Sequence, residues 1–204
     1  MRSLSALLIR RWRGALVAWL PILAAFAGSA AATTVLPLDL RELTGRADRI
    51  FLGRVEDVRS GRDASGLPAV WTTFAVDESL KGQAGSHVTL KELGTSFGGS
   101  GTVVTPHAGI PRHRLGESVV LFVHADSTLG FTSPVGLGQG CFRIREQDGG
   151  RVVENDVGNR NLAVEGAAAA RAQRGAPPIP SGAPEPLPLT TLLERVRGLV
   201  AAGH

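Results

Sequence analysis

Residues Val70 to Leu80, VWTTFAVDESL, show the pattern from which the fold class follows. Along it Val70, Thr72, Phe74 and Val76 fall on one face, and the residues between them fall on the other. Successive side chains of a β-strand point to opposite faces of the sheet, so a period of two is typical of a strand. We therefore predict a strand here.

Further β-rich runs flank this stretch on both sides. They are short and are separated by glycine-containing turns, which is the pattern of a small β-barrel or sandwich. The run VVLFVH at residues 119–124 is the most hydrophobic and is expected to be a central strand. The other predicted strands lie at residues 50–58, 87–93 and 131–135, and a hairpin joins 141–145 to 151–154.

The composition agrees with a small β-protein. The 204 residues are enough for one domain with tails. The 43% of hydrophobic residues allows a packed core, whereas 26 Gly, 12 Pro and 5% aromatic residues disfavour a helical bundle. We predict a mainly β fold, a partly open barrel of five to six strands, with a short helix within residues 33–49 that ends at Gly45 and a C-terminal helix.

Residues 1–32 are typical of a cleavable signal peptide. Arginines supply a positive start, residues 15–27 are apolar, and small residues at 28–32 offer a cleavage site. This predicts a secreted or periplasmic protein that is not stably inserted in a membrane after cleavage. An uncleaved membrane anchor is the alternative, because the apolar stretch approaches a spanning length.

The rest of the chain divides into three segments by composition. We expect the β domain at residues 33–160, an Ala/Pro-rich linker at 161–188 and an amphipathic helix at 189–204. Thr191 and Glu194 have the spacing of a capping box at the start of this helix. We expect the helix to dock on the β domain, because a short isolated helix is marginal in water. A helix that binds a partner is the alternative.

The charge of the exported part argues against binding to polyanions. Four of the 22 basic residues lie in residues 1–32, which leaves 18 basic and 18 acidic residues. Nucleic-acid binding needs a surplus of Lys and Arg together with aromatic side chains for stacking. Trp71 is the only Trp after residue 32 and Tyr is absent, so we expect no nucleic-acid partner.

The single cysteine, Cys141, limits the chemistry of the chain. It allows neither an intramolecular disulfide nor a zinc site built from several thiolates. We interpret it as a buried, small apolar residue.

Three blocks of the sequence resemble the family of tissue inhibitors of metalloproteinases and netrin-like proteins. ADRIFLGRV at residues 47–55 resembles the opening strand of that fold, FAVDESLKG at 74–82 its second signature, and GESVVLFV at 116–123 the strand after its long loop. The blocks occur in the family's order and cover residues 45–155.

The resemblance implies a barrel of the oligonucleotide/oligosaccharide-binding type. GQG at residues 138–140 and FRI at 142–144 are similar to secreted bacterial proteins that share the three blocks. The metalloproteinase inhibitors chelate the zinc of their target through an N-terminal cysteine that disulfides brace. This chain has no cysteine near its expected new N-terminus, so the resemblance transfers the fold and no functional residue.

A long loop at residues 94–116 is the candidate binding region, because loops of this length in compact domains are often functional. The two loop histidines are interpreted as solvated, with a metal or anion site as the alternative. Neither a paired metal-ligand spacing nor a serine-nucleophile motif is present. The candidate binding residues are Phe97, Thr105, His107, Arg112 and His113.

Two classes of function follow from these observations. The favoured one is an exported, non-catalytic binding module without metal or cofactor, whose loop and barrel rim hold a secreted or envelope protein, with a metalloprotease among the candidates. The alternative is a metal-dependent hydrolase that uses His107, His113 and Glu117. A structural envelope protein whose C-terminal helix docks on a neighbour is a third hypothesis.

Overall fold

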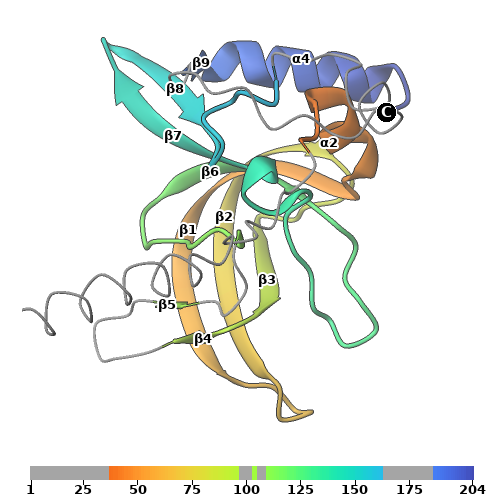
Figure 1. Cartoon of the computed structure of the whole chain (residues 1–204), viewed down its shortest axis with the longest axis vertical. Helices are drawn as coiled ribbons and strands as arrows, with labels where there is room; N and C mark the ends of the chain where they lie inside the picture. The colour runs from red at the N-terminus through yellow and green to blue at the C-terminus, as the bar shows by residue number, and fades with distance from the viewer. Residues whose placement is uncertain (1–36, 97–102, 105–108, 163–185) are drawn as a thin grey trace, which may run out of the picture. The chain divides into compact units, whose positions relative to one another are not determined.

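The computed structural model describes residues 37–96, 103–104, 109–162 and 186–204. Most of its strands form one seven-stranded antiparallel sheet in the order β3-β2-β1-β6-β7-β8-β9, and β4 and β5 form a separate pair (Figure 1). The helices are α2 (Leu40–Arg46) and α4 (Leu189–Ala201), and η1 (Leu137–Gly140) is a 3₁₀ turn. The strands are β1 (Arg49–Arg62), β2 (Pro68–Lys81), β3 (His87–Leu93), β4 (Thr95–Ser96), β5 (Val103–Val104), β6 (Ser118–Val123), β7 (Cys141–Gln147), β8 (Gly150–Glu154) and β9 (Leu187–Pro188).

β1 is an interior strand of the large sheet and pairs with other strands along both of its edges. It pairs with β2 over almost its whole length and with β6 from Arg49 to Arg54. Between Val55 and Asp57 the register with β2 shifts. Such irregularities bend and twist a strand, which accounts for the curvature of β1 and β2 in Figure 1.

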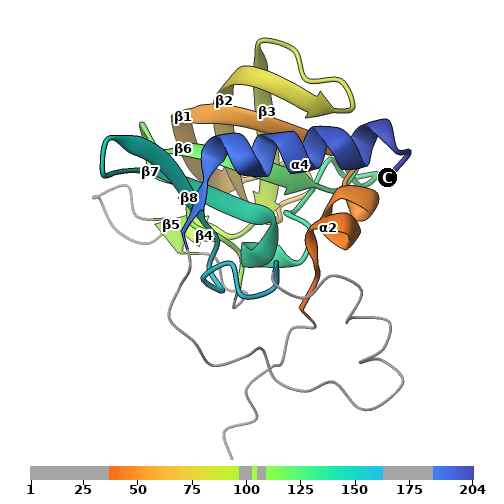
Figure 2. The same cartoon turned by 90° about the horizontal axis from the view of Figure 1, so that it is seen from above.

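The alternation of side chains along β1 builds two cores, one on each face of the sheet. Ile50 and Leu52 join the core that also contains the buried residues of the two helices. Phe51 points to the opposite face and packs edge-on against Phe74 of β2, with ring centroids 5.5 Å apart. Figure 2 shows α2 and α4 together over one side of the sheet.

α2 begins at a capping box that the sequence analysis did not select. Asp39 Oδ1 accepts a hydrogen bond from the Glu42 N–H at 2.8 Å, and Glu42 Oε2 accepts one from the Asp39 N–H at 3.2 Å. The exchange satisfies two backbone donors that a helix start leaves without partners. The helix ends at Arg46, close to the predicted end at Gly45.

α4 packs on the sheet, in agreement with the expected docking of the C-terminal helix. Its buried residues are Leu189, Leu192, Leu193 and Val196, which belong to the helix-side core. The capping box predicted at Thr191 and Glu194 is wrong. The helix begins two residues earlier, at Leu189, and its N-cap Pro188 makes no side-chain capping bond.

The prediction of a mainly β fold with two flanking helices is confirmed, and the large sheet contains seven strands rather than five or six. Within the described ranges no pairing joins β3 to β7, β8 or β9, so the sheet is not closed into a barrel. The strand predicted at residues 131–135 is reduced to one bridge, Val123 to Pro134. Leu187 and Pro188, predicted as linker, pair with β8.

No helix in the described part of the chain is long and apolar enough to cross a membrane. The predicted signal peptide, residues 1–32, lies outside the described residues, as does most of the predicted linker.

Candidate functional site

Residues 109–117, the end of the long loop, are fixed to the domain at both ends. The Gly109 carbonyl accepts a hydrogen bond from the Gly138 N–H at 2.8 Å. At the other end Val55 of β1 accepts from the Gly116 N–H at 2.9 Å and donates to the Glu117 carbonyl at 2.8 Å. We call residues 109–117 the anchored segment.

His113 is the inward-facing residue of this segment. Its side chain is 2% exposed, and its ring packs edge-on against Phe74 with centroids 5.1 Å apart and an interplanar angle of 87°. Arg112 and Arg114 on either side are exposed. The interpretation of His113 as a solvated loop histidine is therefore wrong, because side chains at residues 111–114 alternate between buried and exposed and that of His113 faces inward.

Glu92 of β3 faces the same interior. Its side chain is 3% exposed, and its Oε2 lies 4.0 Å from Nε2 of His113. Thr72 of β2 is also buried and pairs with Leu90, two residues from Glu92 along the same face of β3. We call Thr72, Glu92 and His113 the buried cluster.

The buried cluster is not satisfied by hydrogen bonds. Within the described residues, Thr72 Oγ1, Glu92 Oε1 and both ring nitrogens of His113 are buried and have no hydrogen-bond partner. A distance of 4.0 Å between His113 and Glu92 exceeds a hydrogen bond, and one polar atom placed between the two groups could bond to both. Buried polar atoms without partners destabilise a fold.

Burial sets the protonation of the two titratable members. Removal from water raises the pKa of the Glu92 carboxyl to about 8. Desolvation, with a further contribution from the positive charge of Arg143, lowers the pKa of His113 to about 4. Near pH 7 the favoured pair is therefore a protonated carboxyl opposite a neutral imidazole. This pair can donate and accept hydrogen bonds without carrying net charge.

Glu117 closes the cluster on its outer side but is engaged elsewhere. Its Oε2 lies 4.0 Å from His113 Nδ1. Glu117 also forms an ion pair with Arg143 Nε at 2.9 Å and accepts a hydrogen bond from the Arg114 N–H at 3.1 Å. Arg143 also pairs with Asp156. The charge of Glu117 is thus compensated, which leaves it a weak candidate for a general base.

The described residues do not assemble a metal centre. No group of three or more His, Cys, Asp or Glu side chains in these ranges could hold a metal ion. Cys141 is free and buried, as predicted, and burial raises the pKa of its thiol. A protonated, inaccessible thiol is a poor nucleophile.

The selected loop residues divide into two groups. Arg112 and His113 lie in the anchored segment, where the first is exposed and the second buried. Phe97, Thr105 and His107 lie outside the described residues. Glu92 and Thr72 were missed, although the alternation of β3, with Val88 and Leu90 on one face, places Glu92 on that buried face too.

A second buried polar group, which we call the asparagine network, follows β8 and was also missed. It comprises Gln139, Asn155, Asn159 and Asn161. Asn155 Nδ2 donates to the Gln139 carbonyl and to Asn161 Oδ1, both at 3.0 Å, and Asn155 Oδ1 accepts from the Asn159 N–H at 2.8 Å. Gln139 Oε1 and Asn161 Nδ2 bind the two backbone polar groups of Leu38. Residues 156–162 form turns. The asparagine-rich sequence NDVGNRN at 155–161 is the signal that could have predicted them, because asparagine side chains bond to the backbone in turns.

Comparison of the chain with known protein families, with curated proteins and with solved structures gave no match.

Proposed function

We propose that this chain is an exported, non-catalytic binding module that holds a protein partner on its long loop. The observation that carries the proposal is the construction of the anchored segment. Its residue His113 is buried, whereas Arg112 and Arg114 are exposed and Leu115 is 73% exposed. Two cations and one large apolar side chain therefore project from a backbone that is tied at both ends.

Such a surface suits recognition of a protein. A segment that is ordered before binding loses less conformational entropy when the partner arrives, and arginine is enriched in protein interfaces. The exposed side chains favour a partner that offers carboxylates beside an apolar patch. A secreted protease or an envelope protein is the partner class that agrees with the proposed signal peptide.

We also propose the partly open barrel that the resemblance to netrin-like proteins implies. The curved strands β3, β2, β1, β6 and β7 lie in one continuous antiparallel order, and the two helices cover the same face (Figure 2). Both features support that architecture, as a barrel of this type can remain open along one seam.

The experiment uses the chain from Thr33 with a cleavable N-terminal tag as bait for the secreted and envelope fraction of its host. Deletion of residues 97–108, and separately the pair Arg114→Glu and Leu115→Ser, are expected to reduce capture of a specific partner at least tenfold. Leu129→Ser alters another exposed leucine (55%) and is expected to leave capture unchanged. Equal capture by all four proteins would show that the partner binds elsewhere.

A metal-dependent hydrolase remains the second candidate, and one observation favours it. Both nitrogens of His113 are without hydrogen-bond partners in the described residues, and a carboxyl group lies 4.0 Å away. Stoichiometric zinc or copper in protein purified without an affinity tag, lost in His113→Ala, would support this candidate. Protein that neither contains nor binds either metal would remove it.

A further inference from the structure

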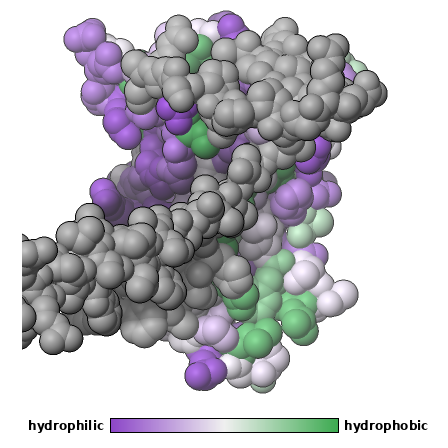
Figure 3. Space-filling view, viewed as in Figure 1, coloured by the Kyte–Doolittle hydropathy of each residue, from purple (hydrophilic) through white to green (hydrophobic). Residues whose placement is uncertain are grey.

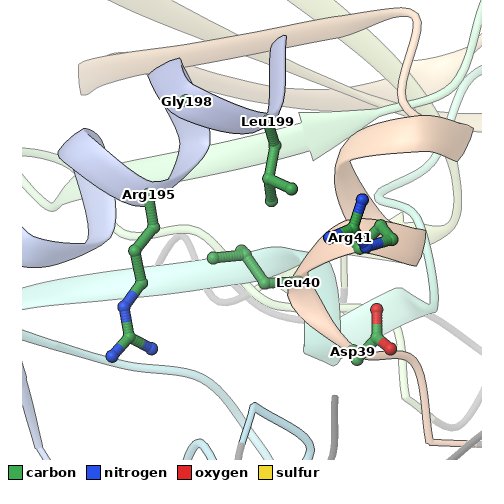
Figure 4. A pocket seen from close by; sticks show the side chains of 6 residues that line it. All are labelled: Asp39, Leu40, Arg41, Arg195, Gly198 and Leu199. Carbon is green, nitrogen blue, oxygen red and sulfur yellow. The ribbon is translucent and has the colours of Figure 1, made fainter. Parts of the chain in front are cut away.

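A pocket of about 310 Å³ lies between α2 and α4, on the face of the sheet that the helices cover (Figure 4). Pockets of this size accommodate small organic molecules. Leu40 of α2 and Leu199 of α4 point toward one another across it in Figure 4. The lining residues are Asp39, Leu40, Arg41, Arg195, Gly198 and Leu199.

The charges around the pocket favour an anion. Two guanidinium groups, on Arg41 and Arg195, stand against a single carboxylate, on Asp39. That carboxylate is engaged in capping α2, where its Oδ1 accepts from the Glu42 N–H. Figure 4 shows Arg195 on the opposite side of Leu40 from Asp39, so an anion at Arg195 avoids the carboxylate.

Arg195 is the cation that is available to a ligand. Arg41 Nη1 forms a hydrogen bond with Nε2 of His204 at 2.5 Å. In the described part of the chain Arg195 makes neither an ion pair nor a side-chain hydrogen bond, whereas Arg197 of the same helix forms a bidentate pair with Glu78. An arginine without an internal partner beside an apolar wall can bind a carboxylate through two parallel hydrogen bonds.

Gly198 provides a second, independent observation. It lies inside α4, where glycine is less favourable than alanine by about 1 kcal/mol. A Cβ built at Gly198 would meet no atom within 4 Å, so close packing does not require glycine there. The absence of a side chain leaves the pocket open at this position.

We propose that the pocket between α2 and α4 binds a carboxylate that carries an apolar group. The carboxylate pairs with the guanidinium of Arg195, and the apolar group lies between Leu40 and Leu199 above Gly198. This chemistry is shared by a free medium-chain fatty acid and by the C-terminus of a peptide that ends in an apolar residue. The site is separate from the anchored segment, and its occupation does not depend on the proposed function.

The test is titration of the full chain by calorimetry with octanoate, with octanamide, and with an acetylated peptide that ends in a free C-terminal leucine. Octanoate or the peptide is expected to bind with a Kd of about 1 mM or tighter, and the tighter of the two identifies the source of the carboxylate. Octanamide is expected to bind at least tenfold more weakly, because it lacks the charge.

Variants separate binding from folding. Arg195→Gln is expected to weaken octanoate binding about tenfold or more, since a hydrogen-bonded charge pair is lost. Gly198→Leu is expected to abolish binding while raising Tm, because it fills the pocket and improves helix propensity. Gly45→Leu, at an exposed glycine of α2 that does not line the pocket, is expected to leave binding unchanged.

Three results would overturn the proposal. The first is the absence of any heat of binding at ligand concentrations up to 10-fold above the expected Kd. The second is equal affinity of the wild-type chain and Arg195→Gln for octanoate, and the third is retained octanoate binding by Gly198→Leu. A folded Gly198→Leu protein, verified by its Tm, ensures that lost binding reports the pocket and not the stability of α4.

Discussion

The buried cluster and the asparagine network are both built from buried polar side chains, yet only one of them is satisfied. In the network, the single residue Asn155 forms hydrogen bonds with each of Gln139, Asn159 and Asn161. In the cluster, Thr72, Glu92 and His113 contribute four buried atoms that have no hydrogen-bond partner in the described residues. A complete network rigidifies a fold, whereas an incomplete one lowers its stability.

The asparagine network stabilises the fold through its hydrogen bonds, whereas the buried cluster leaves polar groups available to bond another molecule. Removing a member of the network leaves the groups to which it was bonded without a hydrogen-bond partner. Removing a member of the cluster takes no hydrogen-bond partner from any group in the described residues, and an apolar replacement of similar shape can stabilise the fold. Opposite responses to substitution are therefore expected from two sites of similar burial.

The largest effect is expected for Asn155→Ala. It leaves the N–H groups of Val157 and Asn159 and the carbonyl of Gln139 without their partner. We expect a loss of about 3 kcal/mol in the free energy of unfolding, measured with urea, since each stranded buried group costs about 1–3 kcal/mol. Asp156→Ala, at the exposed neighbouring position, is the control and is expected to cost under about 1 kcal/mol. A loss below 1 kcal/mol for Asn155→Ala would show that the network is dispensable.

The next effect concerns pH and Glu92. Its pKa in the folded chain, about 8, lies above the ordinary value of 4.5. The stability that the protonated Glu92 carboxyl contributes to the folded chain is therefore fully present below pH 4.5 and is lost as the pH rises through 8. We expect Glu92→Gln to gain stability relative to the wild-type chain between pH 5 and pH 8, by an amount on the order of a few kcal/mol. Urea unfolding at a series of pH values measures it. Glu146→Gln, at an exposed carboxylate, should show no such gain, and a parallel pH profile for Glu92→Gln would contradict the expectation.

A smaller effect is expected for His113→Phe. The substitution keeps an aromatic ring against Phe74 and removes two nitrogens without partners. At pH 7 we expect stability to be unchanged or higher by about 1 kcal/mol. The pKa of His113 is lowered from an ordinary 6.5 to about 4. The stability that neutral His113 contributes is therefore fully present above pH 6.5 and is lost as the pH falls through 4. The variant should lack this acid sensitivity in thermal melts, and a loss of more than 1 kcal/mol at pH 7 would show that the nitrogens are bonded.

The smallest effect is expected for Thr72→Val, which exchanges a buried hydroxyl without a partner for a methyl group of similar size. We expect a gain of about 0.5 kcal/mol. The matched control is Thr44→Val, because the equally buried Thr44 hydroxyl donates to the Leu40 carbonyl at 2.7 Å and its loss should cost about 1 kcal/mol. Equal changes in Tm for the two variants would remove the distinction between satisfied and unsatisfied hydroxyls.

The sequence carried most of the information about the strands but little about where they end. The alternation that predicted residues 87–93 agrees with β3, because that strand has one buried face. β1 continues to Arg62, past the predicted end at residue 58, through residues that are exposed. An exposed hairpin has no hydrophobic period, so its length depends on pairing with β2 and could not be predicted from composition.

The candidate site was less predictable, because it depends on contacts between distant residues. The sequence showed His113 with arginines beside it, which is also the pattern of a solvated loop. Its burial follows from packing against Phe74 and Glu92, which belong to other elements. The position of Glu92 could have been predicted from the period of two in β3, whereas its proximity to His113 required the fold.

The attachment of Leu38 to the asparagine network has a mechanical consequence. Its N–H donates to Gln139 Oε1 at 2.8 Å, and its carbonyl accepts from Asn161 Nδ2 at 2.6 Å. A force that pulls on the residues before Pro37 therefore reaches these two side-chain bonds and the start of α2 before it loads β1. Two amide side chains hold Leu38 on the domain. Under a force applied to the preceding residues, we expect Leu38 to separate from these side chains first, while the sheet is still intact.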